Sequence, residues 1–81
     1  MAQKRERSLA KIEVKSEITG TVWKVQCAPG DHVEAGAVLV IVESMKMEIP
    51  VMTEDAGVVE TILVKEKDPV VEGQVVAVLE G

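Results

Sequence analysis

Few residues of this chain could do chemistry, and the most distinctive of them is Lys46, which lies between Met45 and Met47. A solvent-exposed lysine is ordinarily protonated at neutral pH, so it is a poor enzymatic base. It is nevertheless a good acceptor for an acyl group that a separate enzyme has activated. The ordinary interpretation of the same residues is a solvated turn lysine with two methionines in the core. The choice between the two depends on the elements that position Lys46.

The other candidate residues form no recognisable catalytic or metal-binding pattern. His32 and Cys27 are the only histidine and the only cysteine, which leaves no metal-ligand spacing. The carboxylates of Glu43, Glu48, Glu54 and Asp55 could pair as acid and base, but strand ends commonly carry such solvated charges. We therefore predict no catalytic residues and no metal site.

Composition narrows the possible partners. The net charge of −5, the pI near 4.8 and the single aromatic residue disfavour a nucleic-acid partner. We expect no membrane partner, because no apolar run is long enough to cross a bilayer and no signal peptide is evident. A single cysteine suits a reducing compartment, so a cytoplasmic location is expected.

The chain is an internal duplication around Lys46. Setting residues 11–43 over residues 48–80, at a constant offset of 37, gives ten identities in 33 gapless pairs. Among them are Gly20/Gly57, Asp31/Asp68 and Gly36/Gly73. Only Ser44, Met45, Lys46 and Met47 remain between the two copies, so Lys46 marks the joint.

Each copy has the pattern of short strands and turns. Apolar residues alternate from Lys11 onward, Pro29-Gly30 suits a type II turn, and Gly36 and Gly73 suit bends with positive φ. The apolar run Val38–Val42 is typical of a strand buried on both faces. The second copy repeats the succession of strands and turns, with Val58–Val64, then Gly73, then Val75–Leu79. We predict an all-β barrel or sandwich of about eight strands with pseudo-twofold symmetry. Lys46 would then lie at an exposed hairpin tip, with the chain ends near the opposite pole.

Domain organisation follows from the repeat. Residues 11–81 are predicted to be one domain, and residues 1–10, which lie outside the repeat, a flexible N-terminal extension.

The joint also carries a resemblance to a known family. Glu43-Ser44-Met45-Lys46-Met47 resembles the Glu-(Ala/Ser)-Met-Lys-Met signature of the biotinyl domains of biotin-dependent carboxylases. The glycines agree in register: Gly20, Gly30 and Gly36 before the lysine, Gly57 and Gly73 after it. The resemblance covers residues 11–80.

The resemblance implies a flattened antiparallel barrel of two four-stranded sheets, called a barrel-sandwich hybrid. It implies that a biotin–protein ligase attaches biotin covalently to Lys46 through biotinyl-adenylate, and that Met45 and Met47 are the flank that partners recognise. Glu43 and Ser44 complete the signature. The biotin would then carry carboxyl groups from a biotin carboxylase site to a carboxyltransferase site, and the resemblance implies that the chain itself catalyses nothing and is not an enzyme.

Two alternatives stay open, and one departure from the family pattern bears on the fold. A lipoyl carrier would share the fold, although lipoyl domains typically have Asp-Lys-Ala at this place. An unmodified structural or interaction module would need no lysine at the tip. Lys67-Asp68-Pro69 replaces the usual Gly-Asp of the second turn, and the residue before a proline is restricted to extended geometry, so that turn is expected to open differently.

Overall fold

The computed structural model describes residues 11–81, and within that range every regular element is a β-strand. The expected extension, residues 1–10, lies outside the described residues. The strands are β1 (Lys11–Lys15), β2 (Gly20–Val25), β3 (His32–Val33), β4 (Val38–Ser44), β5 (Met47–Met52), β6 (Gly57–Ile62), β7 (Pro69–Val70) and β8 (Val75–Glu80).

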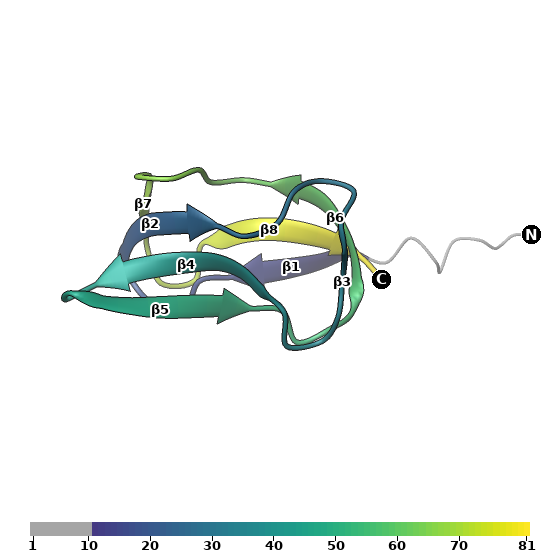
Figure 1. The fold of residues 1–81 in the computed structure, drawn as a ribbon, viewed down its shortest axis with the longest axis horizontal. Coiled ribbons are helices and arrows are strands. Elements are labelled where there is room, and N and C mark those ends of the chain that lie inside the picture. Colours follow the sequence, from purple (N-terminus) through teal and green to yellow (C-terminus); the bar gives the residue numbers. More distant parts are fainter. Residues whose placement is uncertain (1–10) are drawn as a thin grey trace, which may run out of the picture.

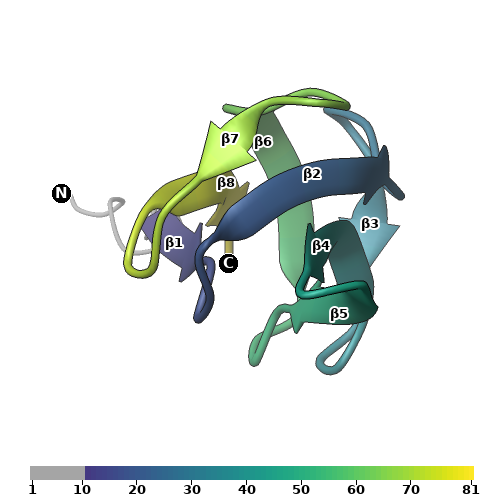
Figure 2. The same cartoon turned by 90° about the vertical axis from the view of Figure 1, so that its left-hand side faces the viewer.

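The strands form two four-stranded antiparallel sheets in the orders β1-β8-β6-β3 and β5-β4-β2-β7. Seen end-on, the two sheets curve around a common interior (Figure 2), and the buried side chains form one cluster there. The predicted fold class, a flattened antiparallel barrel of two four-stranded sheets, is confirmed.

The duplication is a structural symmetry. An offset of 37 residues converts the first four strands into the last four and one sheet order into the other. Backbone hydrogen bonds obey the same offset. The Ser16 N–H donates to Gln74 O at 2.9 Å, and its counterpart, the Thr53 N–H, donates to Ala37 O at 3.0 Å. The two copies therefore fold alike and complete each other's core.

The core is aliphatic, as the near absence of aromatic residues requires. Its buried side chains, mostly β-branched residues that suit a pleated surface, are Val14, Val22, Leu39, Val40, Val42, Val51, Val59, Val64, Val70, Val76, Ala77 and Leu79. The buried hydroxyls of Ser16 and Thr53 donate to the carbonyls of Ile18 and Asp55, so neither is left unpaired.

The prediction that Val38–Val42 is buried on both faces is wrong. Val40 and Val42 point into the core and are fully buried, whereas Val38 and Ile41 point outward and are half-buried. Leu39 is buried because a β-bulge between the Val38 and Val40 pairs turns it inward. No second layer covers the outer face of this sheet within residues 11–81.

The prediction that the second turn opens differently is also wrong. Asp68 N–H donates to Lys65 O at 3.0 Å, as Asp31 N–H donates to Ala28 O in the first copy. Lys67 takes the left-handed conformation of its counterpart Gly30, with φ of 78° against 95°. The turn keeps its shape at the expense of backbone strain at Lys67. Gly36 and Gly73 have positive φ, as predicted.

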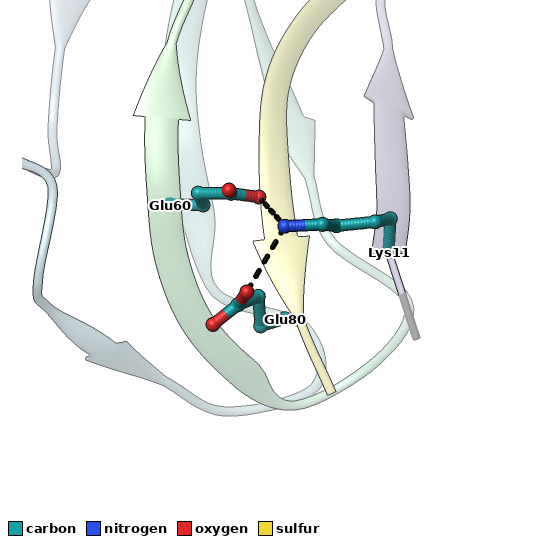
Figure 3. Close-up of polar contacts among 3 residues, drawn as sticks. All are labelled: Lys11, Glu60 and Glu80. Carbon is teal, nitrogen blue, oxygen red and sulfur yellow. Dashed lines mark hydrogen bonds and ion pairs between the residues drawn. The ribbon is translucent and has the colours of Figure 1, made fainter. Parts of the chain in front are cut away.

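The two poles of the barrel carry different features. The β4–β5 hairpin is at one end, and β1 begins beside the C-terminus at the other (Figure 1). There Lys11 Nζ lies 3.0 Å from a carboxylate oxygen of Glu80 and also pairs with Glu60 (Figure 3). The described chain thus begins and ends at the pole opposite the hairpin, as predicted.

Candidate functional site

Lys46 lies in the tightest turn of the barrel. Ser44 and Met47 are the last paired residues of β4 and β5, so the loop consists of Met45 and Lys46 alone. Their φ angles are 52° and 65°. Positive φ at both central residues is the signature of a type I′ turn, which matches the twist of the strands it joins. The predicted hairpin at the joint between the two copies is therefore observed.

The side chains of this turn face solvent. Met45 is 92% exposed and Met47 is 63% exposed, and Lys46 is also exposed. The interpretation of the two methionines as core residues is thus wrong. The two exposed thioethers form an apolar flank around the exposed Lys46 side chain, an arrangement that suits contact with another protein.

The strands below the turn are held in the barrel by burial and by pairing. Val40 and Val42 anchor β4 in the core, and β5 pairs with β4 along its whole length. On the other side of β4, Gly20 of β2 packs so closely that a Cβ atom would lie 2.3 Å from Glu43 O. The sequence pattern identified Gly20 only as a repeated glycine, and its close approach to the base of the hairpin required the structure.

Two carboxylates lie at the base of the turn. Glu43 and Glu48 are directly opposite each other on β4 and β5, and both are exposed. Like charges at such a pair are unfavourable for the sheet. The half-buried Ser44 lies between this pair and the tip. Of the residues predicted for the site, the hairpin brings Glu43, Ser44, Met45, Lys46 and Met47 together.

The other candidate groups lie away from the hairpin. Exposed His32 belongs to β3, and Cys27 lies in the loop after β2. Burial, with a smaller contribution from the charge of Asp31, raises the pKa of the Cys27 thiol, which lowers its thiolate content at neutral pH. Residues 11–81 contain no cluster of three or more His, Cys, Asp and Glu side chains that could hold a metal ion.

Sequence patterns missed one exposed residue near the site. Trp23, the only aromatic residue, occupies a β-bulge of β2 and is 42% exposed, with Lys24 Nζ 5.5 Å from the ring centroid. Its signal in the sequence is that it is a lone tryptophan in an otherwise aliphatic domain.

Comparisons with known proteins agree with this fold and site. Residues 10–79 match a family model described as "Biotin-requiring enzyme". The biotin/lipoyl attachment protein of Bacillus subtilis is 42% identical over 64 residues, which are 79% of this chain and 88% of that protein. A homolog of the biotinylated protein TB7.3 from Mycobacterium leprae is 42% identical over 67 residues, 83% of this chain and 94% of the relative.

A solved structure shows the same fold inside a large enzyme. The crystal structure of Kluyveromyces lactis urea carboxylase aligns with 98% of this chain at a TM-score of 0.83 and 40% identity. The aligned part is 7% of that enzyme, so this chain spans a small fraction of its length.

The two-sheet barrel and the exposed lysine of its hairpin together define a small β domain of the kind that carries an attached group. The chain belongs to the biotin/lipoyl attachment family, since the family model covers nearly all of it and short relatives match over most of their length. Between residues 11 and 81 there is no helix that could span a membrane.

Proposed function

We propose that this chain is a biotin carboxyl carrier and that Lys46 is the residue to which biotin is attached. The observation that carries the proposal is the exposed lysine of a two-residue hairpin, flanked by two exposed methionines. A biotin–protein ligase would supply the activated biotinyl group. Lys46 Nζ, once it has lost a proton, attacks the acyl carbon, an amide bond forms, and the activating group leaves with the bonding electrons.

The residues present fit an attached biotin. The amine projects from the end of the barrel and the turn is fixed by the β4–β5 pairing, so a long acyl group can extend into solvent from a defined point. Biotin supplies a ureido nitrogen that can carry a CO2 unit. The chain holds the cofactor at high local concentration for a biotin carboxylase and then a carboxyltransferase, and it catalyses neither step.

Intact-mass analysis tests the attachment site. The protein is incubated with a purified biotin–protein ligase, biotin and MgATP. We expect one biotin adduct on the wild type and none on Lys46→Arg, which keeps the charge of the turn. Lys67→Arg is a matched control, because Lys67 is also exposed and also has positive φ in a turn, but lacks the methionine flank. It should retain the adduct.

Two results would contradict the proposal. One is an adduct that survives Lys46→Arg. The other is a lipoyl adduct, with no biotin adduct, when the wild type is offered lipoate with a lipoate–protein ligase.

A further inference from the structure

The internal symmetry of the barrel allows its two outer faces to be compared position by position. On the sheet that carries the hairpin, the outward residues of β2, β4 and β5 include Trp23, Ile41, Pro50 and Met52, which we call the apolar face. Exposed Lys24 lies among them, paired with Ile41 and with its Nζ 5.5 Å from the centroid of the Trp23 ring. The counterparts of the four apolar residues at the 37-residue offset on the other sheet are Glu60, Val78, Glu13 and Lys15. Three of the four positions that are apolar on one sheet are charged on the other.

Folding does not explain this difference. Trp23 and Glu60 occupy equivalent β-bulges, between the Val22 and Lys24 pairs and between the Val59 and Thr61 pairs. Because Glu60 occupies the equivalent bulge of β6, this bulge does not need an apolar residue in order to form. Trp23 and Met52 are 42% and 52% exposed, so they bury less apolar surface than a core role would require. Exposed apolar side chains gathered on one face of a small domain indicate contact with another molecule.

The apolar face is continuous with the turn that holds Lys46. Ile41 and Pro50 pair across β4 and β5 and lie three residues from Ser44 and Met47. At about 3.3 Å per residue the face begins roughly 10 Å from the turn. Beside it, a hollow of about 480 Å³ follows the open edge of β5 and is lined in part by Ile18, Ile49, Pro50 and Met52. An apolar side chain of a partner could enter this hollow.

Charge indicates what kind of partner fits. Glu43 and Glu48 lie opposite each other between the tip and the apolar face, and within residues 11–81 neither carboxylate forms an ion pair that would relieve their repulsion. A cationic group of a partner placed between them would relieve it. The complementary surface is therefore a protein that presents apolar side chains beside a basic one.

We propose that the apolar face is the docking surface for the enzyme that acylates Lys46. The proposal rests on the proposed function. The acylating enzyme must bring Lys46 Nζ to its activated acyl carbon with the reach of a single lysine side chain, so its surface has to lie against the body of the carrier. An enzyme that acts on the attached biotin has the added length of the cofactor and needs no such contact.

The test compares rates of biotinylation by a purified bacterial biotin–protein ligase, with biotin and MgATP, for three full-length proteins. Trp23→Glu gives β2 the residue that its counterpart bulge already has, so the variant should fold. Thr61→Glu adds the same charge to the other sheet, at the position equivalent to Lys24. We expect KM for the carrier to rise at least tenfold for Trp23→Glu with kcat changed less than threefold, and both constants to stay within twofold for Thr61→Glu.

A spectroscopic measurement separates docking from misfolding. Because Trp23 is the only tryptophan, 5-fluorotryptophan gives a single ¹⁹F resonance, which should shift or broaden when the ligase is added to Lys46→Arg protein. Circular dichroism confirms that each variant is folded.

Each other outcome overturns the docking proposal. Biotinylation of Trp23→Glu at the wild-type rate, an unchanged ¹⁹F resonance, or a defect confined to carboxylation of the biotinylated protein assigns the face to something other than the ligase. A wild-type dimer that Trp23→Glu dissociates would assign the face to a second copy. If the wild type acquires no biotin, both the docking proposal and the proposed function are overturned. If the wild type is biotinylated and Trp23→Glu is biotinylated equally fast, only the docking proposal is overturned.

Discussion

At Lys67 the tertiary structure requires a backbone conformation that a nonglycine residue does not favour. Lys67 has φ of 78°, whereas its counterpart Gly30 meets the same requirement without a Cβ atom. A nonglycine residue in the left-handed region costs about 1–2 kcal/mol. The turn closes in spite of this cost because the second copy must match the first: Lys67 N–H donates to Val22 O as Gly30 N–H donates to Val59 O.

Lys67→Gly should therefore stabilise the protein. Relief of about 1–2 kcal/mol of strain exceeds the extra chain entropy that glycine loses, about 0.5–1 kcal/mol, so we expect the free energy of unfolding to rise by about 0.5–1 kcal/mol. Urea unfolding measures it. The control is Lys65→Gly, at the first residue of the same turn, where φ is negative and the substitution should destabilise. Equal effects of both substitutions would exclude strain at Lys67.

At the scale of the element, the β4–β5 hairpin has a turn that is poorly suited to its own geometry. Asparagine and glycine are the favoured residues of type I′ turns, yet Met45 and Lys46 occupy both central positions. The pairing of β4 with β5 and the burial of Val40 and Val42 hold the turn in place. Stability therefore does not explain the residues of this turn, and the proposed function accounts for them by contact with partners.

Met45→Asn separates the stability of the turn from its recognition by a partner. Asparagine tolerates positive φ, so the free energy of unfolding should rise by about 0.5–1 kcal/mol. The rate of biotin attachment should fall, because the apolar flank of Lys46 is halved. Denaturant unfolding and intact-mass time courses on the same samples measure the two effects. An unchanged attachment rate would show that the exposed Met45 side chain takes no part in recognition.

At the scale of the whole molecule, the two poles of the pseudo-twofold barrel differ: one carries the Lys46 hairpin and the other carries ion pairs that join the ends of the described chain. Lys11, Glu80 and Glu60 form an ion-paired cluster where the described chain begins and ends. Their counterparts at the hairpin pole are Glu48, Glu43 and Trp23. The position equivalent to Lys11 is thus occupied by the carboxylate Glu48, and not by a cation that could pair with Glu43. Within residues 11–81 the same scaffold thus pairs its charges at one pole and leaves Glu43 and Glu48 without an ion pair at the other.

The closing cluster predicts a pH dependence. Hydrogen bonds to Glu60 and then Glu80 raise the pKa of Lys11 above its ordinary value of 10.5. A raised lysine pKa stabilises the folded state below 10.5 and ceases to do so as the pH rises through the folded value. The stability difference between the wild type and Lys11→Met should therefore be constant at neutral and mildly alkaline pH and shrink above pH 10.5.

Urea unfolding of both proteins over that range measures the difference, and high salt should reduce it at neutral pH because the pair is exposed. A difference that grows with alkaline pH would contradict the assignment of the pair.

Much of this fold was predictable from the sequence because its strand and turn patterns depend on neighbouring residues and occur in two copies. Two copies of one pattern at an offset of 37 determine eight strands, the pseudo-twofold symmetry and the place of Lys46 in the connecting hairpin. Glycines that need positive φ, such as Gly36 and Gly73, mark their own bends.

Only the tertiary structure decided which surfaces are covered. The apolar run Val38–Val42 has the composition of a strand buried on both faces, yet Ile41 is half-exposed because no layer packs on that sheet within residues 11–81. Met45 and Met47 are exposed because the hairpin extends past the end of the barrel. Lys67 adopts a glycine conformation because hydrogen bonds with the opposite copy enforce the turn. Burial and strain depend on neighbours distant in sequence, whereas strand periodicity and turn chemistry depend on residues close together in the chain.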